Sequence, residues 1–331
     1  MGNTKVMKVY YNSIEKNKNN SDVFRGVGLG NFDGVHLGHR AIISTLTKAC
    51  REKGYSSMIY TFRNHPNNIL FEQKTLLIIS TEAKEMIIKS LDVNELYFAD
   101  FDMDYAHMSP ETFVKNIIVD ELNAKLVVVG YDYTFGCYGQ GKADDLVEFG
   151  KKYDFEVIIV PAVKHALQET DGSITEITVS STILRQLIKE GRVEQYKSLT
   201  DSYYTIPGRV VSGNHRGGGF GFPTANIVPS KEFAIPKYGV YASQTRIGTK
   251  MYRSITNIGD NPTFGDVTQA VVETHLMDFH ESIYGDEISV HFLEKIRNEI
   301  KFASVEQLLE QIMKDINVRV KMEDELIEHS L

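Results

Sequence analysis

The chain has 331 residues, enough for two domains, and its hydrophobic content of 42% and charged content of 24% are those of an ordinary globular protein. Its formal net charge of -8 provides no positive field for nucleic acid, so we expect no nucleic-acid partner. Two cysteines cannot build a disulfide framework, no apolar run approaches the length of a membrane span, and the lysine-rich start does not resemble a signal peptide. We therefore expect a cytoplasmic protein without a membrane partner.

From residue 23 to about residue 190, short apolar runs alternate with helical segments. Strands are predicted at residues 27–30, 57–62, 95–98, 126–129 and 157–160, and helices at residues 39–53, at residues 82–91 and from Ser109 onward. Runs of β-branched residues without polar alternation are typical of strands that are covered on both faces. This order predicts an α/β domain with a parallel sheet flanked by helices.

After Arg192 the pattern changes, because apolar and polar residues alternate and glycine or proline recurs every few residues. This spacing predicts antiparallel strands that form a small β-barrel. From Ser304 onward helical periodicity predicts one long amphipathic helix packed on the barrel, with its apolar positions at Leu308, Leu309, Ile312, Ile316 and Val320. We place the first domain at residues 1–190, a linker at 191–202 and the second domain at 203–331.

A glycine-rich turn, GNFDGVHLGH at residues 30–39, lies between the first predicted strand and the first predicted helix. Its glycines remove Cβ atoms where the main chain would approach a ligand, at a place where α/β sheets bind phosphate. His36 and His39 can share one face of the first helical turn and donate hydrogen bonds as neutral side chains. The alternatives are two structural histidines or a zinc pair, although no cysteine or acidic cluster completes four zinc ligands.

A second glycine-rich segment, RGGGFGFPTAN at residues 216–226, precedes the alternating strand that contains Glu273. So many glycines indicate a close approach of the main chain to a ligand, and the residues that follow are not of linker composition. Strand periodicity places Glu273 on the face opposite Val272, Thr274 and Leu276. Taken alone, Glu273 is an ordinary solvent-facing carboxylate.

Residues 30–39 resemble the HxGH signature of the nucleotidyltransferase superfamily, in the version found in bacterial FAD synthetases. Three further motifs follow in that family's order: TFRNHP at 61–66 resembles its aromatic His-Pro loop, GYDYTFG at 130–136 its flavin and adenine loop, and SSTILR at 180–185 its closing motif. The resemblance implies a Rossmann-like nucleotidyltransferase domain in residues 1–190. This domain would join the adenylyl group of ATP to FMN, giving FAD and pyrophosphate.

The same resemblance implies roles for single residues of this domain. His36, His39 and Arg185 would be catalytic, because the attacking FMN phosphate is already ionised and needs positioning and charge stabilisation. The residues that would bind ATP and phosphate are Gly30, Asn31, Phe32, Asp33, Gly34, Gly38, Ser180, Ser181 and Thr182. The residues that would bind flavin are Phe62, His65, Pro66, Asp132 and Phe135.

The glycine-rich segment at 216–226 is similar to the GFPTAN signature of riboflavin kinases. This resemblance implies that Thr224 and Asn226 hold Mg²⁺ with the nucleotide phosphates, a use that suits hard oxygen ligands. It also implies that Glu273 is the general base that takes the proton of the ribityl hydroxyl, and that Arg297 binds on the flavin side. The residues that would bind ATP here are Gly217, Gly218, Gly219, Gly221 and Pro223.

Residues 257–264 and 284–285 match further riboflavin kinase motifs, so the resemblance extends over nearly the whole chain in the correct domain order. The chain is thereby identified as a member of the bifunctional family that makes FMN from riboflavin and then FAD. ATP would be the co-substrate and Mg²⁺ the cofactor, with riboflavin, FMN and FAD as further binding partners. Weak self-association stays open.

Two departures from the family pattern leave alternatives open. Arg63 and Asn64 replace the usual acidic residue and proline, and Cys137 and Tyr138 stand where basic residues are common. The first alternative is therefore a riboflavin kinase with a degenerate adenylyltransferase domain. Others are a nucleotidyltransferase with another acceptor, a non-catalytic flavin sensor and an aminoacyl-tRNA synthetase relative. The kinase-like domain, the presence of Glu273 and the acidic balance argue against these three in turn.

Overall fold

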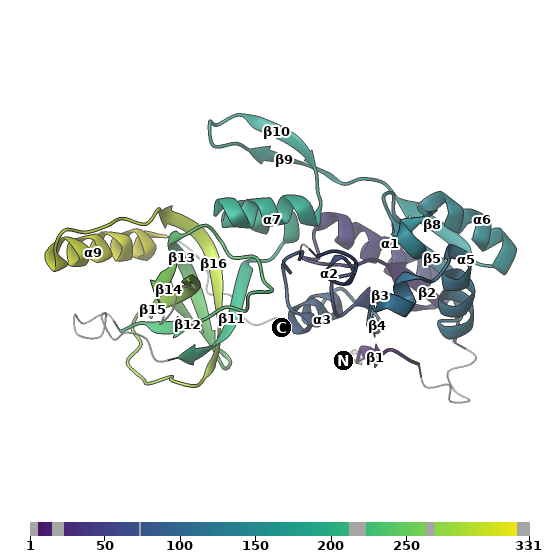
Figure 1. Ribbon diagram of the computed structural model, residues 1–331, viewed down its shortest axis with the longest axis horizontal. Coiled ribbons are helices and arrows are strands. Elements are labelled where there is room, and N and C mark those ends of the chain that lie inside the picture. Colours follow the sequence, from purple (N-terminus) through teal and green to yellow (C-terminus); the bar gives the residue numbers. More distant parts are fainter. Residues whose placement is uncertain (1–5, 15–22, 73, 212–222, 263–267, 323–331) are drawn as a thin grey trace. The chain divides into compact units, whose positions relative to one another are not determined.

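A computed structural model describes residues 6–14, 23–72, 74–211, 223–262 and 268–322 of the chain (Figure 1). The chain divides into two compact units, Met1–Ser181 and Thr182–Ser330. Within the described residues no helix is both long and apolar enough to cross a membrane.

The first unit is built on a six-stranded parallel sheet with the strand order β1-β4-β3-β2-β5-β8. The strands are β1 (Lys8–Tyr11), β2 (Arg25–Leu29), β3 (Ser56–Phe62), β4 (Glu95–Ala99), β5 (Ala124–Gly130) and β8 (Glu156–Val160). The predicted parallel sheet is thus confirmed, together with its five predicted strands. Strand β1 was missed, because KVYY is short and only half-buried.

Helices connect these strands, as predicted for an α/β unit. They are α1 (Leu37–Lys53), α2 (Asn67–Leu70), α3 (Thr81–Lys89), α4 (Met103–Ala106), α5 (Pro110–Phe113), the π-helix η1 (Val114–Glu121) and α6 (Ala143–Tyr153). Local sequence explains their ends, since Gly54 closes α1 with a φ of 71° and the Ser109 side chain caps α5 ahead of Pro110. The predicted helices at residues 39–53 and 82–91 correspond to α1 and α3.

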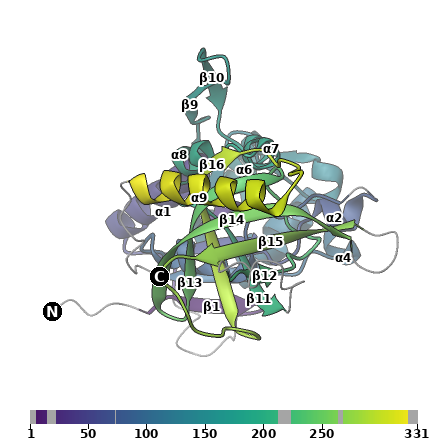
Figure 2. The ribbon, with the colours of Figure 1, turned by 90° about the vertical axis from the view of Figure 1, so that its left-hand side faces the viewer.

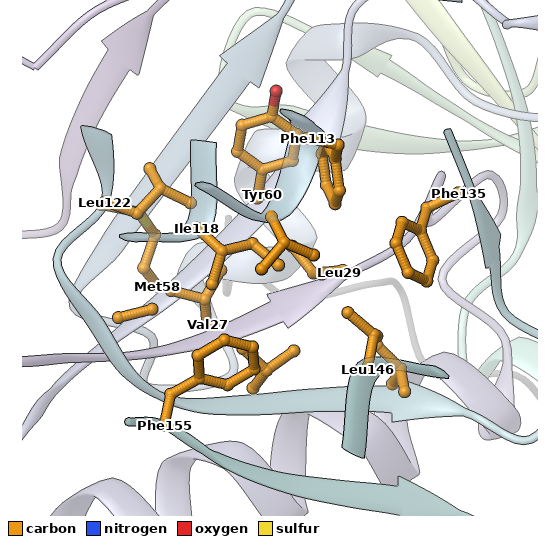
Figure 3. Packing of buried hydrophobic residues seen from close by; sticks show 14 of the residues in the cluster. Val27, Leu29, Met58, Tyr60, Phe113, Ile118, Leu122, Phe135, Leu146 and Phe155 are labelled. Atoms are coloured by element: carbon orange, nitrogen blue, oxygen red, sulfur yellow. The ribbon is translucent and has the colours of Figure 1, made fainter. Parts of the chain in front are cut away.

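The sheet separates two hydrophobic layers. On one face Val27 and Leu29 of β2 pack with residues of η1 and α6, including Ile118 and Leu146 (Figure 3). On the other face β2 presents glycines, and a Cβ at Gly26 would lie 2.2 Å from the Sγ of Cys50 on α1. The missing side chains allow α1 to approach the sheet, which positions the turn at its N-terminus.

Two hairpins extend the first unit. Strands β6 (Thr134–Phe135) and β7 (Gly141–Lys142) flank the short 3-10 helix η2 (Cys137–Gly139). Strands β9 (Lys164–Gln168) and β10 (Ile174–Thr178) form a second, longer hairpin, which is labelled in Figure 1. Neither hairpin was predicted, because both are short and mostly exposed.

The second unit is a closed barrel with the strand order β11-β12-β15-β14-β13-β16, in which every neighbouring pair is antiparallel. Its strands are β11 (Tyr204–Val211), β12 (Ala225–Ile227), β13 (Gly239–Ile247), β14 (Lys250–Pro262), β15 (Thr268–Leu276) and β16 (Glu287–Arg297). The predicted antiparallel barrel is confirmed. Helices α7 (Ser181–Glu190) and α8 (Val193–Thr200) precede it, so the predicted linker at 191–202 contains a helix.

The terminal helix α9 (Val305–Lys321) is confirmed and crosses the barrel in Figure 2. Its most buried residues are polar, however: Asp315 is paired with Arg297 at 2.8 Å, and Arg319 donates to the carbonyl oxygen of Ser243 at 3.2 Å. The prediction that Val320 belongs to the packed stripe was wrong, because 56% of its surface is exposed. Paired charges, which helical periodicity does not reveal, hold part of this interface.

A buried ion pair joins the beginnings of two strands of the first unit. Arg25 of β2 donates to Glu95 of β4 at 2.5 Å, and their side chains are only 2% and 5% exposed. Replacing Glu95 by alanine leaves a buried guanidinium unpaired, so we expect a loss of about 3–5 kcal/mol of unfolding free energy. Chemical denaturation measures this loss. The control is Glu156→Gln, which removes the exposed pair with Lys53 and should cost about 1 kcal/mol or less.

Candidate functional site

The turn between β2 and α1 has an unusual backbone. Phe32 and Val35 have φ angles of 49° and 37°, in the left-handed region that side chains rarely adopt, and Gly34 has a φ of 84°. A β-branched residue in this region is strained, yet Phe32 and Val35 are both fully buried. Buried packing therefore holds the turn in one shape, and such strain is concentrated at functional sites.

The histidine pair is in place at the N-terminus of α1. His36 is the N-cap, and its Nδ1 atom accepts a hydrogen bond from the backbone N–H of His39 at 3.3 Å. The two rings stack with centroids 3.6 Å apart, and Phe32 lies against His39 at 5.0 Å. Among the described residues, the buried Nδ1 atom of His39 has no hydrogen-bond partner. The prediction that both side chains share one face of the first turn is confirmed.

Burial keeps both imidazoles neutral. It lowers the pKa of His36 to about 4, and burial followed by the charges of His36 and Lys84 holds the pKa of His39 well below its usual range. Because Nδ1 of His36 is an acceptor, its proton lies on Nε2. A neutral ring that donates through Nε2 can bind a phosphate oxygen without adding charge to a helix N-terminus.

This protonation state is directly testable. Near pH 6 a free imidazole, with a pKa of about 6.5, is mostly protonated. We expect His36 to remain the neutral Nε2–H tautomer at that pH, as judged by long-range ¹⁵N–¹H correlation spectra of labelled protein. The His36→Asn variant assigns the signal, and a protonated ring at pH 6 would contradict the buried, neutral pair.

Asp33, predicted to bind ATP or phosphate, is buried in the turn and already has hydrogen-bond partners within the protein. Its carboxylate is 2% exposed and accepts the backbone N–H of Ile78 at 3.0 Å. Its carbonyl oxygen accepts the hydroxyl of Ser181 at 2.8 Å. Asp33 therefore ties the loop before α3 and Ser181, the last residue of the first unit, to the histidine turn. Val179, just before the closing motif, also lies close to this turn, since its carbonyl oxygen is 3.8 Å from the Cβ position of Gly38.

The other residues predicted for the phosphate site of the first unit lie in the closing motif and at the start of the histidine turn. Ser180 is half-buried, Thr182 is exposed, and Arg185 follows one helical turn after Ser181 on α7. Gly30 directly follows β2, and a Cβ there would lie 3.1 Å from the Phe32 ring, so a larger residue would displace that ring. Asn31 is half-buried and contributes its carbonyl oxygen to the interior of the turn.

An aromatic layer follows β3. Phe62 packs edge-to-face on Phe101 and on Tyr105, each with a ring centroid 5.3 Å away. Phe135, which is 5% exposed, packs on Phe113 at 5.5 Å. Apolar rings of this kind can stack on a flat heteroaromatic ligand. Among the predicted flavin residues, Phe62 and Phe135 thus belong to one aromatic region.

The other predicted flavin residues lie in loops. His65 accepts the backbone N–H of Asn67 at 3.2 Å through Nδ1, and Pro66 is the N-cap of α2. Asp132 is exposed after β5, with its Oδ1 atom 3.1 Å from the Cβ position of Gly130. None of these contacts by itself assigns a ligand.

The two departures from the family pattern are accommodated in the fold. Arg63 pairs with Asp100, and the Asn64 amide bonds both backbone groups of Phe101, at 2.7 Å and 2.9 Å. Cys137 is half-buried and donates its backbone N–H to Met108 at 2.7 Å, while Tyr138 is 82% exposed. Arg63 and Asn64 therefore have structural partners that hold the loop after β3 next to the loop after β4.

One residue of this unit that sequence reasoning missed is Lys84 of α3. It is 5% exposed, and its ammonium donates to the carbonyl oxygens of Asn31 and Phe62, at 2.8 Å and 3.1 Å. A lysine inside an amphipathic helix normally lies at the surface, so the only sequence signal was its place among apolar residues of that helix.

In the barrel, strand register aligns polar side chains in one row. Glu273 of β15 is opposite Asn226 of β12 on one side and opposite Asn257 of β14 on the other. Directly opposite residues in antiparallel strands project to the same face, with Cβ atoms about 4.5–5.5 Å apart. Val272, Thr274 and Leu276 are buried and Glu273 is half-buried, so the predicted facing of this strand is confirmed. Asn257 was noticed in a motif but was not predicted as a site residue.

The oxygen atoms in this row suit a hard cation. Asn226 is 6% exposed and donates from its Nδ2 atom to the carbonyl oxygen of Thr224 at 3.4 Å, which leaves the side-chain oxygen as its acceptor end. Thr224 is half-buried, Pro223 is exposed, and the carbonyl of Pro223 lies 2.9 Å from the Nδ1 atom of His275. Hydroxyl, amide and carboxylate oxygens are the ligands that Mg²⁺ takes.

The glycines at 217, 218, 219 and 221 lie outside the described residues. Arg297 donates from Nε and Nη2 to the buried carboxylate of Asp315, at 3.0 Å and 2.8 Å, and therefore anchors α9. Within the described residues no group of three or more histidine, cysteine and acidic side chains is placed to hold a metal ion.

Two family models match the chain. The model described as FAD synthetase matches residues 18–175, and the model described as riboflavin kinase matches residues 200–322. Two relatives, from Listeria monocytogenes and Bacillus subtilis, are each named bifunctional riboflavin kinase/FMN adenylyltransferase. They are 36% and 34% identical, over 89% and 87% of this chain and 91% and 89% of their own.

A solved structure from Streptococcus pneumoniae has the same fold throughout. It superposes with a TM-score of 0.81 at 33% identity, covering 96% of this chain and all of its own. That protein is described as a macrolide-efflux protein. The description differs from the names of the sequence relatives, whereas both family models and those relatives agree with one another.

Proposed function

This chain belongs to the family of bifunctional riboflavin kinase/FMN adenylyltransferases, and from that premise we propose which residues perform each of its two reactions. The enzyme phosphorylates riboflavin with ATP to give FMN and then transfers an adenylyl group from ATP to FMN. Our division assigns residues 1–190 to adenylyl transfer and residues 203–331 to the kinase.

For the kinase, we assign Glu273 as the general base. The ribityl hydroxyl of riboflavin must lose its proton as it attacks the γ-phosphorus of ATP, and a carboxylate can accept that proton. The observation that supports this assignment is the register that aligns Glu273 with Asn226 and Asn257. We infer that Asn257 orients the carboxylate from the neighbouring strand.

A magnesium ion fits the other end of this row. Thr224 and Asn226 would hold it, and when bound it neutralises charge on the transferring phosphoryl group. We further assign Gly217, Gly218, Gly219, Gly221 and Pro223 to binding of the ATP phosphates, and Arg297 to the flavin side. Because Arg297 is already held by Asp315, it would act on the flavin side from a fixed position.

For adenylyl transfer, we assign His36, His39 and Arg185 to the phosphates of ATP. The FMN phosphate attacks the α-phosphorus as an ionised group, so this site needs no strong base and works by positioning and charge stabilisation. The neutral, mutually stacked histidines support this assignment. The turn residues Gly30, Asn31, Phe32, Asp33, Gly34 and Gly38 would shape the phosphate site, with Ser180, Ser181 and Thr182 beside it. Flavin would bind at Phe62, His65, Pro66, Asp132 and Phe135.

We place the enzyme in the cytoplasm, because both reactions consume ATP. We propose no nucleic-acid or membrane partner, in keeping with the net charge of -8.

The assignments are tested by chromatography of the flavins that form when purified protein is incubated with riboflavin, ATP and Mg²⁺. We expect FMN first and FAD later. Accumulation of FMN without FAD, also under reducing conditions, would contradict an active histidine site and favour the kinase-only alternative. Absence of both products would contradict both assignments.

A further inference from the structure

Lys84 is a buried cation that the proposed reactions do not use. Its ammonium has three hydrogen-bond partners: the carbonyl oxygens of Asn31 and Phe62, and the hydroxyl of Thr61 at 3.3 Å. Among the described residues, all its hydrogen-bond partners are thus uncharged oxygens. A charged ammonium loses much of its hydration when it is 5% exposed, which is costly without a paired anion.

The contacts join the histidine turn, which we assign to ATP, to the end of β3, where we assign Phe62 to flavin. Asn31 belongs to the histidine turn, whereas Thr61 and Phe62 end β3, and the Thr61 hydroxyl itself donates to the carbonyl of Asn31 at 2.9 Å. Lys84 therefore bridges the histidine turn and the end of β3. A shift of either segment would break at least one of these hydrogen bonds.

The charge of Lys84 also acts on the histidine pair. It lowers the pKa of His39. The carboxylate of Asp33, in the same turn, raises the pKa of Lys84 and so opposes the larger lowering by burial. The Asp33 carboxylate is occupied with the amides of Ile78 and Ile79. The ammonium of Lys84 thus contributes a positive charge at the turn, which the Asp33 carboxylate partly offsets, and a positive charge favours the binding of an anion nearby.

We propose that Lys84 is a positioning residue of the adenylyl-transfer site, which locks the histidine turn against the end of β3 and supplies a fixed positive charge for the ATP phosphates. This proposal rests on the assignment of the histidine turn to ATP. Because the charge on the phosphates is present before and during the reaction, Lys84 should affect ATP binding more than the chemical step.

The main test compares the variants Lys84→Met and Lys84→Arg in steady-state FAD formation from supplied FMN. We expect Lys84→Met to raise KM for ATP about tenfold, with kcat changed by less than about threefold. Lys84→Arg keeps the charge and should recover part of this loss. The matched control is Lys89→Met on the exposed side of the same helix, which should behave as wild type.

The kinase in the same chain reports on folding. We expect riboflavin phosphorylation by Lys84→Met to equal that of wild type. An unchanged KM for ATP in FAD formation would overturn the proposal, and so would a parallel loss of both activities with a lowered Tm, which indicates a purely structural lysine. Normal FAD formation by His36→Asn would instead contradict the histidine assignment itself, so the two failures are distinguishable.

The pH dependence separates charge from hydrogen bonding. Burial lowers the pKa of Lys84 to about 8, so the ammonium is charged below that pH and loses its charge above it. The titratable groups of neighbouring elements that interact electrostatically with Lys84 are Asp33 and His39. Strand β3 contributes only the uncharged hydroxyl of Thr61 and the carbonyl of Phe62. The acidic residues of α3 itself are Glu82 and Glu85.

His39 stays neutral above pH 7, and phosphate esters complete their ionisation at a pKa of about 6, so neither titrates in this range. We expect KM for ATP to rise in wild type as the pH increases from about 7.5 to about 9.5, and to stay flat in Lys84→Arg. The same rise in both proteins would overturn the charge role.

Discussion

Replacing Glu273 by glutamine is expected to lower the rate of riboflavin phosphorylation by about 10²–10⁴-fold, the range for loss of a general base. Glutamine has nearly the same volume and preserves the place of the side chain between Asn226 and Asn257, but it cannot accept the proton of the ribityl hydroxyl. Conversion of supplied FMN to FAD should stay at the wild-type rate. Both rates are measured by chromatography of the flavin products.

The control for this variant is Glu287→Gln. Glu287 is also on a barrel strand, but its side chain is 66% exposed and pairs with Arg209 at the surface. We expect the control to retain full kinase activity. If Glu273→Gln phosphorylates riboflavin within about threefold of wild type, another group must accept the proton and the assignment of the base is wrong.

Replacing His36 by asparagine should have the complementary effect. We expect FAD formation from FMN to fall by about 10²–10³-fold, as is typical when one donor that stabilises transition-state charge is lost. Phosphorylation of riboflavin should be unchanged. Asparagine is itself a good N-cap, so it can still accept the backbone N–H of His39 and preserve the start of α1.

His165→Asn is the matched control, since His165 is also a histidine of the first unit, half-buried, but lies on the β9–β10 hairpin, outside the histidine turn. It should form FAD as wild type does. Full FAD formation by His36→Asn, with an unchanged melting temperature, would show that the histidine pair is only a helix cap. Loss of both activities would indicate misfolding instead.

The two variants together test whether the activities are independent. Each substitution lies in a different compact unit, and each is expected to remove only one product. A mixture of Glu273→Gln and His36→Asn proteins should then convert riboflavin to FAD, because FMN released by one protein is a substrate for the other. Failure of the mixture, with each single activity intact, would indicate that FMN does not pass through solution.

The sequence by itself determined the parallel sheet of the first unit with its flanking helices, and the antiparallel barrel of the second unit. It also determined the motifs at residues 30–39 and 223–226. These are local signals: β-branched runs, alternation, and the caps Ser109 and Gly54 act within a few residues of the chain. Strand periodicity was sufficient to place Glu273 on the face opposite the barrel interior.

Tertiary structure alone decided how separate segments meet. Periodicity could not show that Asn257 lies opposite Glu273, because strand register depends on pairing between distant segments. Periodicity also could not show that the charged residues Asp315 and Arg319 of α9 are buried while Val320 is exposed. Burial of the two charges is possible only because Arg297 and the carbonyl oxygen of Ser243 on the barrel are their partners.

Lys84 illustrates the same limit at the first site. In the sequence it is one of two lysines on a short amphipathic helix, and nothing in the pattern marks it as buried. Folding closes the turn at Asn31 and the end of β3 over its side chain, so that three oxygen atoms from two distant segments surround one ammonium. Burial and hydrogen bonding of a single polar group are properties of the packed structure, and they are what distinguish this lysine from the exposed Lys89 five residues later.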